Sequence, residues 1–208
     1  MSSKLSGQHE RCSKFTVAVF GDSGVGKSSI VRSFVNQSSI QEHMPTVEEF
    51  YVTQINHGKR DYELHIIDTS GTYEFPAMRK VAIHKADAAI LVYSLDRPNS
   101  FKKLERYMEE IQSCFRERNR KIPVMIVSNK ADLPNLSEPT FLDDKKGLEI
   151  TSREYIESTW ECQWLASSAR FNLNVATIFH KLLEKLCPAE NKKILSRSGT
   201  IFKAMLRH

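Results

Sequence analysis

The sequence predicts an α/β fold, in which a mostly parallel six-stranded sheet carries helices on both faces. Short apolar runs rich in β-branched and aromatic residues, such as 14–20 and 88–94, alternate along the chain with segments of helical spacing. This alternation is typical of a parallel sheet covered on both sides. A glycine-rich turn between the first apolar run and the first helical segment is the second observation that favours this class.

The composition is that of a single globular domain. The chain has 208 residues, of which 40% are hydrophobic and 26% charged, and this mix is unlike that of a disordered chain. No stretch approaches the ~20 consecutive apolar residues that a membrane-spanning helix needs, and the first residues lack the apolar core of a secretory signal. The four cysteines show no metal-binding spacing, so we expect reduced thiols and an intracellular protein.

The expected elements follow one another in a regular order. Residues 14–20 are predicted to form a buried strand, and the apolar spacing over 27–36 predicts a helix. A second helix is expected to start at residues 96–98 and to run to about residue 118, with Pro98 near its first turn. The remaining expected elements are strands over 50–56, 62–68, 88–94, 123–129 and 163–166, helices near 152–158 and over 175–186, and a loop over 131–150.

Residues 21–28 carry a phosphate-binding pattern. They read Gly-Asp-Ser-Gly-Val-Gly-Lys-Ser and match G-x-x-x-x-G-K-[ST] between a strand and a helix. Backbone N–H groups of such a loop wrap a phosphate, and the helix N-terminus adds partial positive charge. In this pattern Lys27 reaches the β- and γ-phosphates, and the hydroxyl of Ser28 ligates Mg²⁺. A glycine-rich turn that matches by chance is the alternative, and the flanking strand and helix argue against it.

Asp68 is the candidate for a second metal-binding position. It ends the apolar run 64–68, and a carboxylate at the carboxyl end of a strand is well placed to hold a metal, usually through water. Alone, this residue fits a turn cap equally well. Beside a phosphate-binding loop, the metal role is favoured.

Residues 129–132 read Asn-Lys-Ala-Asp and follow a predicted strand. The carboxylate of Asp132 can accept two hydrogen bonds, from N1–H and the exocyclic amine of guanine, and adenine cannot offer this pair. Buried polar groups left unpaired by the wrong base give strong discrimination. The tetrapeptide alone would be interpreted as an ordinary turn. Its position downstream of residues 21–28 and Asp68, and upstream of Ser168-Ala169-Arg170, favours a guanine site.

These motifs together resemble the small GTPases of the Ras superfamily across roughly residues 15–187, in the family's order and near its spacing. The resemblance implies the G domain of the P-loop NTPases, placed here at 14–187 between an N-terminal extension, 1–13, and a basic tail, 188–208. The motifs are GDSGVGKS, MPTVEEF with Thr46, DTSG, NKAD and SAR. The run 68–79, which contains FPAM, looks most like the Di-Ras and Dexras/Rhes branch.

The resemblance also implies a switch between two states. Thr46 would close onto Mg²⁺ and the γ-phosphate, the N–H of Gly71 would touch the γ-phosphate, and the N–H of Ala169 would contact guanine. The γ-phosphate would order residues 37–49 and 70–82, and hydrolysis would release them.

The full set of expected site residues follows from the motifs and the resemblance. We expect Lys27, Thr46, Gly71 and Thr72 to act in hydrolysis, and Ser28, Thr46 and Asp68 to ligate Mg²⁺. The residues expected to bind GTP or GDP are Gly21, Asp22, Ser23, Gly24, Val25, Gly26, Lys27, Ser28, Ser29, Thr46, Asp68, Gly71, Asn129, Lys130, Asp132, Ser168, Ala169 and Arg170.

Two positions depart from the pattern of efficient Ras-like GTPases. Thr72 stands where these proteins usually carry Gln, and a hydroxyl cannot orient the attacking water as the longer amide does. Ser23 stands where many relatives have Gly, so its side chain would crowd an arginine finger. We therefore expect slow hydrolysis and a poor response to a GTPase-activating protein (GAP), with drift in a surface loop as the plain alternative.

The first switch departs from the pattern too. Ser39 and His43 fall where Ras-like chains often place aromatic residues against the guanine and the phosphates. Loss of an aromatic contact costs ~1 kcal/mol, so faster nucleotide release is expected.

The tail carries most of the net charge of +5, because residues 188–208 hold five basic residues against one acidic residue, a net charge of +4. This pattern favours peripheral contact with anionic membrane or an acidic partner over nucleic acid. The last four residues, Met-Leu-Arg-His, do not form a C-a-a-X box, so prenylation is not expected. A solvated tail is the alternative to a weak amphipathic anchor.

Two functional hypotheses stay open from the sequence. The first is a slow, monomeric, cytoplasmic GTPase that binds effectors through residues 37–49 and 70–82 and meets an exchange factor and a GAP, with peripheral contact at the plasma membrane. The second is a GTP-held adaptor with negligible hydrolysis. An ATP-using P-loop kinase is disfavoured because Asn129–Asp132 supplies a guanine partner and no lid of arginines is apparent.

Overall fold

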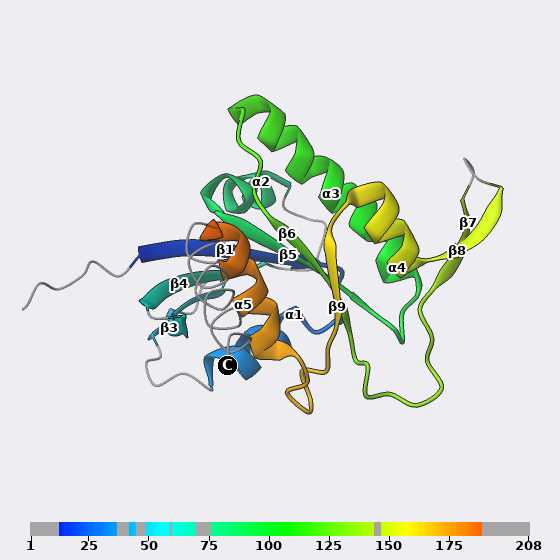
Figure 1. Cartoon of the computed structure of the whole chain (residues 1–208), viewed down its shortest axis with the longest axis horizontal. Helices are drawn as coiled ribbons and strands as arrows, with labels where there is room; N and C mark the ends of the chain where they lie inside the picture. Colours follow the sequence, from blue (N-terminus) through cyan, green and yellow to red (C-terminus); the bar gives the residue numbers. More distant parts are fainter. Residues whose placement is uncertain are drawn as a thin grey trace, which may run out of the picture.

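A seven-stranded sheet runs through the centre of the protein in the computed structural model (Figure 1). The structure describes residues 13–36, 42–44, 49–58, 60–69, 76–143 and 147–188. The strands lie in the order β2-β3-β4-β1-β5-β6-β9. Their bounds are β1 Ser13–Gly21, β2 Glu42–Met44, β3 Glu49–His57, β4 Arg60–Asp68, β5 Ala88–Ser94, β6 Val124–Asn129 and β9 Gln163–Ala166.

Most of the strand pairs are parallel, as the sequence predicts. Strand β1 pairs in parallel with β4 and β5, and β5-β6 and β6-β9 are parallel too. The six expected strands are all present, and the short β2 adds a seventh at the edge beside β3. The carboxyl ends of β1, β4, β5, β6 and β9 therefore meet at one edge of the sheet, where ligands bind in folds of this kind.

Helices cover both faces of the sheet, as expected (Figure 1). Their buried residues fall into two groups, one on each face. Helices α1 (Lys27–Val35) and α5 (Val175–Leu186) pack on one face. Helices α2 (Pro76–Lys85), α3 (Asn99–Arg118) and α4 (Ser152–Tyr155) pack on the other, where α4 continues as a π-helical turn, η1 (Ile156–Trp160).

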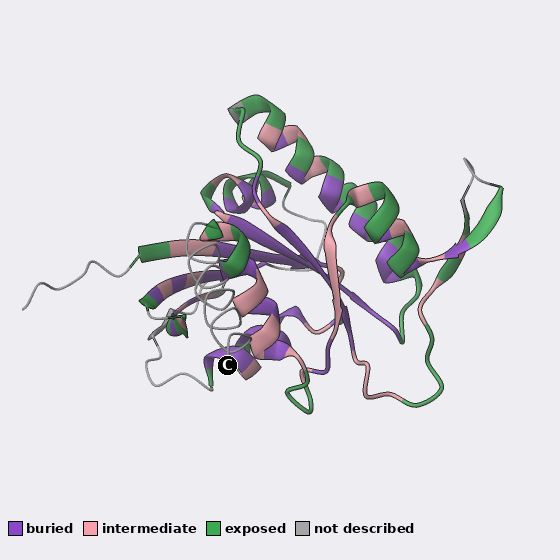
Figure 2. Cartoon of the chain, viewed as in Figure 1, coloured by how far each residue is buried: buried purple, intermediate pink, exposed green. Residues whose placement is uncertain are grey.

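The two cores follow from the side-chain alternation of the strands. In β1, Val17 and Val19 face the α1/α5 core, whereas Ala18 and Phe20 face the α2/α3 core. All residues of β5 and β6 are buried, as Figure 2 shows for the centre of the sheet. Central parallel strands covered on both faces are expected to be apolar throughout. The helices bury their inner sides and expose their outer sides (Figure 2).

A buried ion pair joins α2 to α3. The guanidinium of Arg79 donates from Nε and Nη2 to the two carboxylate oxygens of Glu110, each at 3.0 Å. The side chain of Arg79 is only 4% exposed, and it also lies over the ring of Tyr107. Burial opposes ionisation of Glu110, but the hydrogen bonds and charge of Arg79, with Arg106, hold the pKa of its carboxyl below the ordinary value. Helix α2 is thus fixed to α3 by a bidentate contact.

The loop expected over 131–150 was wrong in part, because it contains a hairpin of β7 (Thr140–Asp143) and β8 (Leu148–Thr151). This hairpin projects from the body of the protein (Figure 1). Its base is held by Phe141, which stacks on Phe101 with ring centroids 5.6 Å apart. Thr151 then forms a capping box with Glu154 that starts α4. The stacking partner is distant in sequence, so local pattern does not reveal it.

Helix α2 was not predicted, because its inward face is not a plain apolar stripe. The buried residues of this helix are Arg79, Ala82 and Ile83. Arginine at a buried position is tolerated here through its pairing with Glu110, and sequence periodicity does not show that pairing. None of the helices in the described part of the chain is long and apolar enough to cross a bilayer.

The aromatic cluster around Phe101 generates a stability prediction. Phe101 is 2% exposed and its ring meets those of Tyr93, Phe141, Tyr155 and Trp160. We expect Phe101→Ala to lower the free energy of unfolding by about 3–5 kcal/mol, because it empties a packed site. Urea denaturation of the full chain with saturating nucleotide measures it.

Phe171→Ala is the matched control. This ring is 68% exposed, so its removal is expected to change the free energy of unfolding by less than about 0.5 kcal/mol. Equal losses for the two variants would contradict the packing described here.

Candidate functional site

The loop between β1 and α1 has no room for side chains at two of its glycines. Gly21 has φ 146° and a Cβ there would lie 2.2 Å from the carbonyl oxygen of Val92. Gly26 has φ 98° and a Cβ there would lie 2.2 Å from Nδ2 of Asn129. Both distances are far below van der Waals contact, so these positions need glycine. The result is a tight loop that leads directly into the N-terminus of α1. Backbone amides in this position form the geometry of a phosphate cradle.

Side chains from outside the loop brace it from the α3 side. Nζ of Lys103 donates to the carboxylate of Asp22 at 2.7 Å, and the hydroxyl of Tyr107 donates to the carbonyl of Gly21 at 3.3 Å. From the β5–α3 connection, Nη1 of Arg97 donates to the carbonyl of Ser23 at 3.0 Å. The guanidinium also lies close against Gly24. The loop is therefore held in shape by contacts that span more than 70 residues of sequence.

Lys27 lies at the first position of α1 and is 6% exposed. Its ammonium donates to the carbonyl of Asp22 at 3.0 Å. Burial lowers the pKa of Lys27, and the nearby carboxylates of Asp68 and Asp22 oppose this shift. A buried ammonium is costly without a strong anionic partner. The site is thus prepared for a polyanion such as a triphosphate.

The oxygen donors expected at a metal are present in part. Asp68 ends β4 at 4% exposure and Ser28 lies in the first turn of α1. Hydroxyl and carboxylate oxygens are the hard ligands that Mg²⁺ prefers. The donor set and the glycine cradle therefore fit a nucleotide with Mg²⁺. The third expected ligand, Thr46, lies outside the described residues, and so do Gly71 and Thr72.

Asn129 connects three parts of the site at the end of β6. It is 1% exposed, and its Nδ2 donates to the carbonyl of Val25 in the phosphate loop at 2.9 Å. Its Oδ1 accepts from the backbone N–H of Ala169 at 3.2 Å and from the hydroxyl of Ser167 at 3.3 Å. One side chain thus fastens the phosphate loop, its own strand and the loop after β9 to one another.

The next residues present their side chains around the same pocket. The hydroxyl of Ser168 donates to Oδ1 of Asp132 at 2.6 Å. Nζ of Lys130 donates to Oδ2 of Asp96 at 2.8 Å. Burial raises the pKa of Asp96, but the hydrogen bonds from Lys130 and Ser94 outweigh it and hold that pKa below the ordinary value. The side chains of Lys130 and Asp132 are therefore both oriented by partners from other loops.

A pocket of about 430 Å³ lies where these loops meet. This volume is within the ordinary range for small-molecule sites. The pocket brings together residues of three of the five motifs that the sequence singles out, namely GDSGVGKS, NKAD and SAR. Its lining is Gly26, Ser29, Asp96, Asn129, Lys130, Asp132, Leu133, Ala169 and Arg170.

The comparisons with known proteins agree with this geometry. A model of the Ras family matches residues 16–188. The chain belongs to the Ras family. It is 37% identical to the GTP-binding protein Di-Ras2 of Mus musculus over 175 residues, which cover 84% of this chain and 82% of that protein.

Two human relatives give the same result. The GTP-binding protein Rhes is 34% identical over 201 residues, covering 90% of this chain and 73% of Rhes. The GTP-binding protein Di-Ras1 is 33% identical over 177 residues, covering 84% of this chain and 82% of Di-Ras1. The resemblance to the Di-Ras and Rhes branch is therefore confirmed. Small GTPases of the Ras family are GTP hydrolases, and this chain has the α/β fold of that family.

The structure adds site residues to this Ras-family domain that sequence reasoning missed. Ser167 is fully buried and joins Asn129, and Arg97 and Lys103 brace the phosphate loop. Ser167 directly precedes the SAR motif, which is the only sequence signal for it. Among the expected residues, Arg170 is exposed and lies over the ring of Phe171, so its contribution at the pocket comes from the rim.

The position of Asn129 generates a prediction about nucleotide retention. Asn129→Ala removes the bonds to Val25 and Ala169 and leaves buried backbone groups unpaired, which costs ~1–3 kcal/mol. We expect GDP to dissociate about tenfold faster or more. Release of a fluorescent GDP analogue by stopped flow measures this rate.

Asn99→Ala, an exposed substitution at the start of α3, is the control and should leave the rate unchanged. An unchanged rate in Asn129→Ala would show that the three loops hold their arrangement without this side chain.

Proposed function

We propose that this chain is a guanine-nucleotide switch that binds GTP and GDP with Mg²⁺ and hydrolyses GTP slowly. The single observation that supports it best is the pocket in which Asp132 lies with Asn129, Gly26 and Ala169. That arrangement supports the proposal, because the carboxylate that we assign to base recognition shares a pocket with a glycine of the loop that we assign to the phosphates. The family of the chain supports the same activity.

Base choice is assigned to Asp132. A carboxylate has about four lone-pair sites, and the hydroxyl of Ser168 donates to Oδ1. The remaining lone pairs can accept from N1–H and the exocyclic amine of guanine. Adenine presents an acceptor at N1, so it would leave the carboxylate unpaired and be rejected.

The phosphates and the metal are assigned to the loop 21–28 and to the oxygen donors around it. Lys27 would pair with the β- and γ-phosphates, and Ser28, Asp68 and Thr46 would hold Mg²⁺. When bound, Mg²⁺ neutralises charge on the phosphate oxygens that are transferred. Burial lowers the pKa of Lys27 against the opposing charges of Asp68 and Asp22, so a bound polyanion would further stabilise its charged form.

Switching is assigned to residues 37–49 and 70–82. In the proposal, Thr46 and the N–H of Gly71 contact the γ-phosphate and order these segments, which then bind effector proteins. Helix α2 begins at Pro76, within the second segment. An exchange factor and a GAP would act on the same two segments.

Slow hydrolysis is assigned to Thr72 and Ser23. A Gln amide both donates to and accepts from the attacking water, and Thr72 is too short to do this. Ser23 is exposed on the phosphate loop, where its side chain would meet an incoming arginine finger. Ser39 and His43 in place of aromatic residues would further speed nucleotide release.

A second candidate is a GTP-held adaptor that scarcely hydrolyses its nucleotide. The departures at Thr72 and Ser23 favour it, whereas the complete loop 21–28 favours a working GTPase. Single-turnover hydrolysis separates the two, because the adaptor would retain GTP throughout.

In either case we propose a monomer of one G domain, 14–187, with the basic tail 188–208 contacting anionic membrane.

Calorimetry with Mg²⁺ tests the base assignment. We expect the chain to bind GDP far more tightly than ADP, and Asp132→Asn to lower GDP affinity at least tenfold because the amide replaces an acceptor with a donor. The same variant should gain affinity for xanthosine diphosphate, whose C2 carbonyl accepts from that amide. Equal binding of GDP and ADP by the unaltered chain would overturn the proposed function.

The hydrolysis assignment has its own test. Thr72→Gln is expected to raise the single-turnover rate about tenfold or more, because the amide reaches the attacking water. Phosphate release from preloaded GTP measures the rate. Thr72→Asn is the matched control: it carries an amide on a shorter stem and should gain much less. A rate unaffected by Gln would place the slow step elsewhere.

A further inference from the structure

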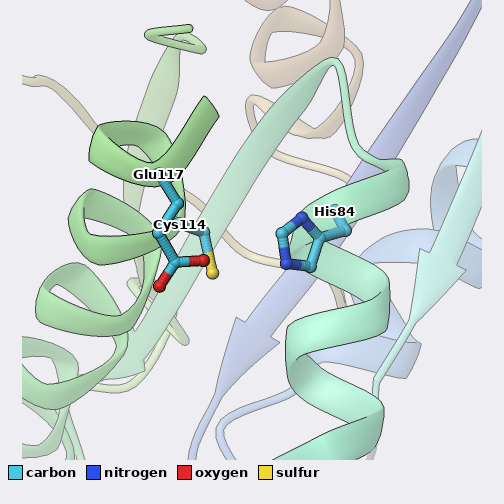
Figure 3. A group of neighbouring side chains, drawn as sticks. All are labelled: His84, Cys114 and Glu117. Atoms are coloured by element: carbon cyan, nitrogen blue, oxygen red, sulfur yellow. The ribbon is translucent and has the colours of Figure 1, made fainter. Parts of the chain in front are cut away.

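Three potential metal ligands face one another between α2 and α3, outside the nucleotide pocket (Figure 3). His84 lies in the last turn of α2, and Cys114 and Glu117 lie near the C-terminal end of α3. Cys114 and Glu117 are three residues apart, so they are neighbours on one face of the helix. Figure 3 shows the imidazole of His84 pointing across the gap toward them.

The distances suit coordination to one ion. One ligand atom from each residue, an imidazole nitrogen, the thiol sulfur and a carboxylate oxygen, lie within 4.8 Å of one another. Zinc binds such atoms at about 2.0–2.3 Å, which places two ligands of a tetrahedral ion roughly 3–4 Å apart. Rotation of the exposed Glu117 side chain and a small movement of the imidazole would close the difference.

The ligand types select the class of metal. A thiolate and a carboxylate with a neutral imidazole carry two negative charges, which balance a divalent cation. Nitrogen and sulfur donors favour zinc and related transition metals, whereas Mg²⁺ and Ca²⁺ prefer oxygen. Cys114 is not in a disulfide, so its sulfur can lose its proton to a bound metal and ligate it as a thiolate. Three protein ligands leave a fourth position for water.

A route for the ion reaches the site from the surface. Cys114 is 3% exposed, His84 is half-buried and Glu117 is exposed. A groove of about 600 Å³ is lined by Cys114 and Glu117 together with Lys80 of α2. The groove also carries Glu109, Arg116 and Glu110, the last of which is already paired with Arg79. The groove gives the buried sulfur an entry path for an ion, one of the features expected of a metal site.

We propose that His84, Cys114 and Glu117 form a binding site for Zn²⁺ or a related divalent transition metal. The ion joins the C-terminal end of α2 to α3. It acts in addition to the Arg79–Glu110 ion pair, which joins the same two helices closer to the start of α2. Helix α2 is then held to α3 at both ends, and the proposal does not depend on which nucleotide the chain binds.

Cobalt spectroscopy of the full chain tests this proposal. Co²⁺ is titrated into protein saturated with GDP and excess Mg²⁺, which fills any oxygen-ligand site. We expect one equivalent to produce a thiolate-to-cobalt charge-transfer band in the near ultraviolet and the intense visible bands of a tetrahedral ion, and Zn²⁺ to displace them. Cys114→Ser and His84→Gln should abolish the charge-transfer band or weaken Zn²⁺ affinity by more than about tenfold.

Two matched controls test thiol and imidazole ligands elsewhere in the protein. Cys162→Ser removes a second thiol that is not in a disulfide, and His180→Gln removes one member of the His57–His180 pair, whose Nδ1 atoms are 3.4 Å apart. Both variants should keep the spectrum. Glu117→Gln, at an exposed position, should weaken Zn²⁺ binding without changing the melting temperature of the metal-free protein.

Three outcomes would overturn the proposal: no thiolate band at one equivalent of Co²⁺, a band that survives in Cys114→Ser, or a band lost in Cys162→Ser. If Cys114→Ser misfolds, the other two ligands still test the proposal. An unchanged Zn²⁺ affinity in the folded Glu117→Gln and His84→Gln variants would contradict it.

Discussion

The site depends on the buried side chain of Asn129, because this one amide connects loops that are far apart in sequence. Its Nδ2 holds the phosphate loop at Val25 and its Oδ1 holds the loop after β9 at Ala169. Gly26 packs closely against the same amide, so the phosphate loop cannot move nearer to Asn129. The spacing between the loop at Val25 and the loop at Ala169 is therefore fixed through one buried amide, which makes the pocket one unit rather than two adjacent ones.

Helix α3 supports this unit from the other side. Lys103 and Tyr107 contact the phosphate loop, and one turn further along Glu110 contacts α2. Successive turns of one helix thus contact the loop between β1 and α1 and then helix α2. A movement of α2 or of the phosphate loop therefore alters contacts of α3. Closely packed interiors transmit such strain rather than absorb it.

The sequence predicted the parts of the protein that are local. Residues 21–28, Asp68 and Asn129–Asp132 carry their chemistry in fixed spacing, and the structure gathers the described ones at one edge of the sheet. It could not predict Arg97 or Lys103, because each acts through a contact with a loop more than 70 residues away. Helix α2 was missed since its buried Arg79 looks like a surface residue until Glu110 is in place. The hairpin of β7 and β8 was missed for a related reason, the distant ring of Phe101.

The bidentate pair between Arg79 and Glu110 has a consequence for how α2 can move. A fork of two parallel hydrogen bonds tolerates little sliding, and separating its charges within a buried interface costs several kcal/mol. Helix α2 can therefore keep the ion pair and move together with α3. Otherwise it must break the pair completely, and the buried guanidinium of Arg79 then needs a new partner. A displacement of α2 relative to α3 must therefore either preserve both hydrogen bonds of this pair or break both.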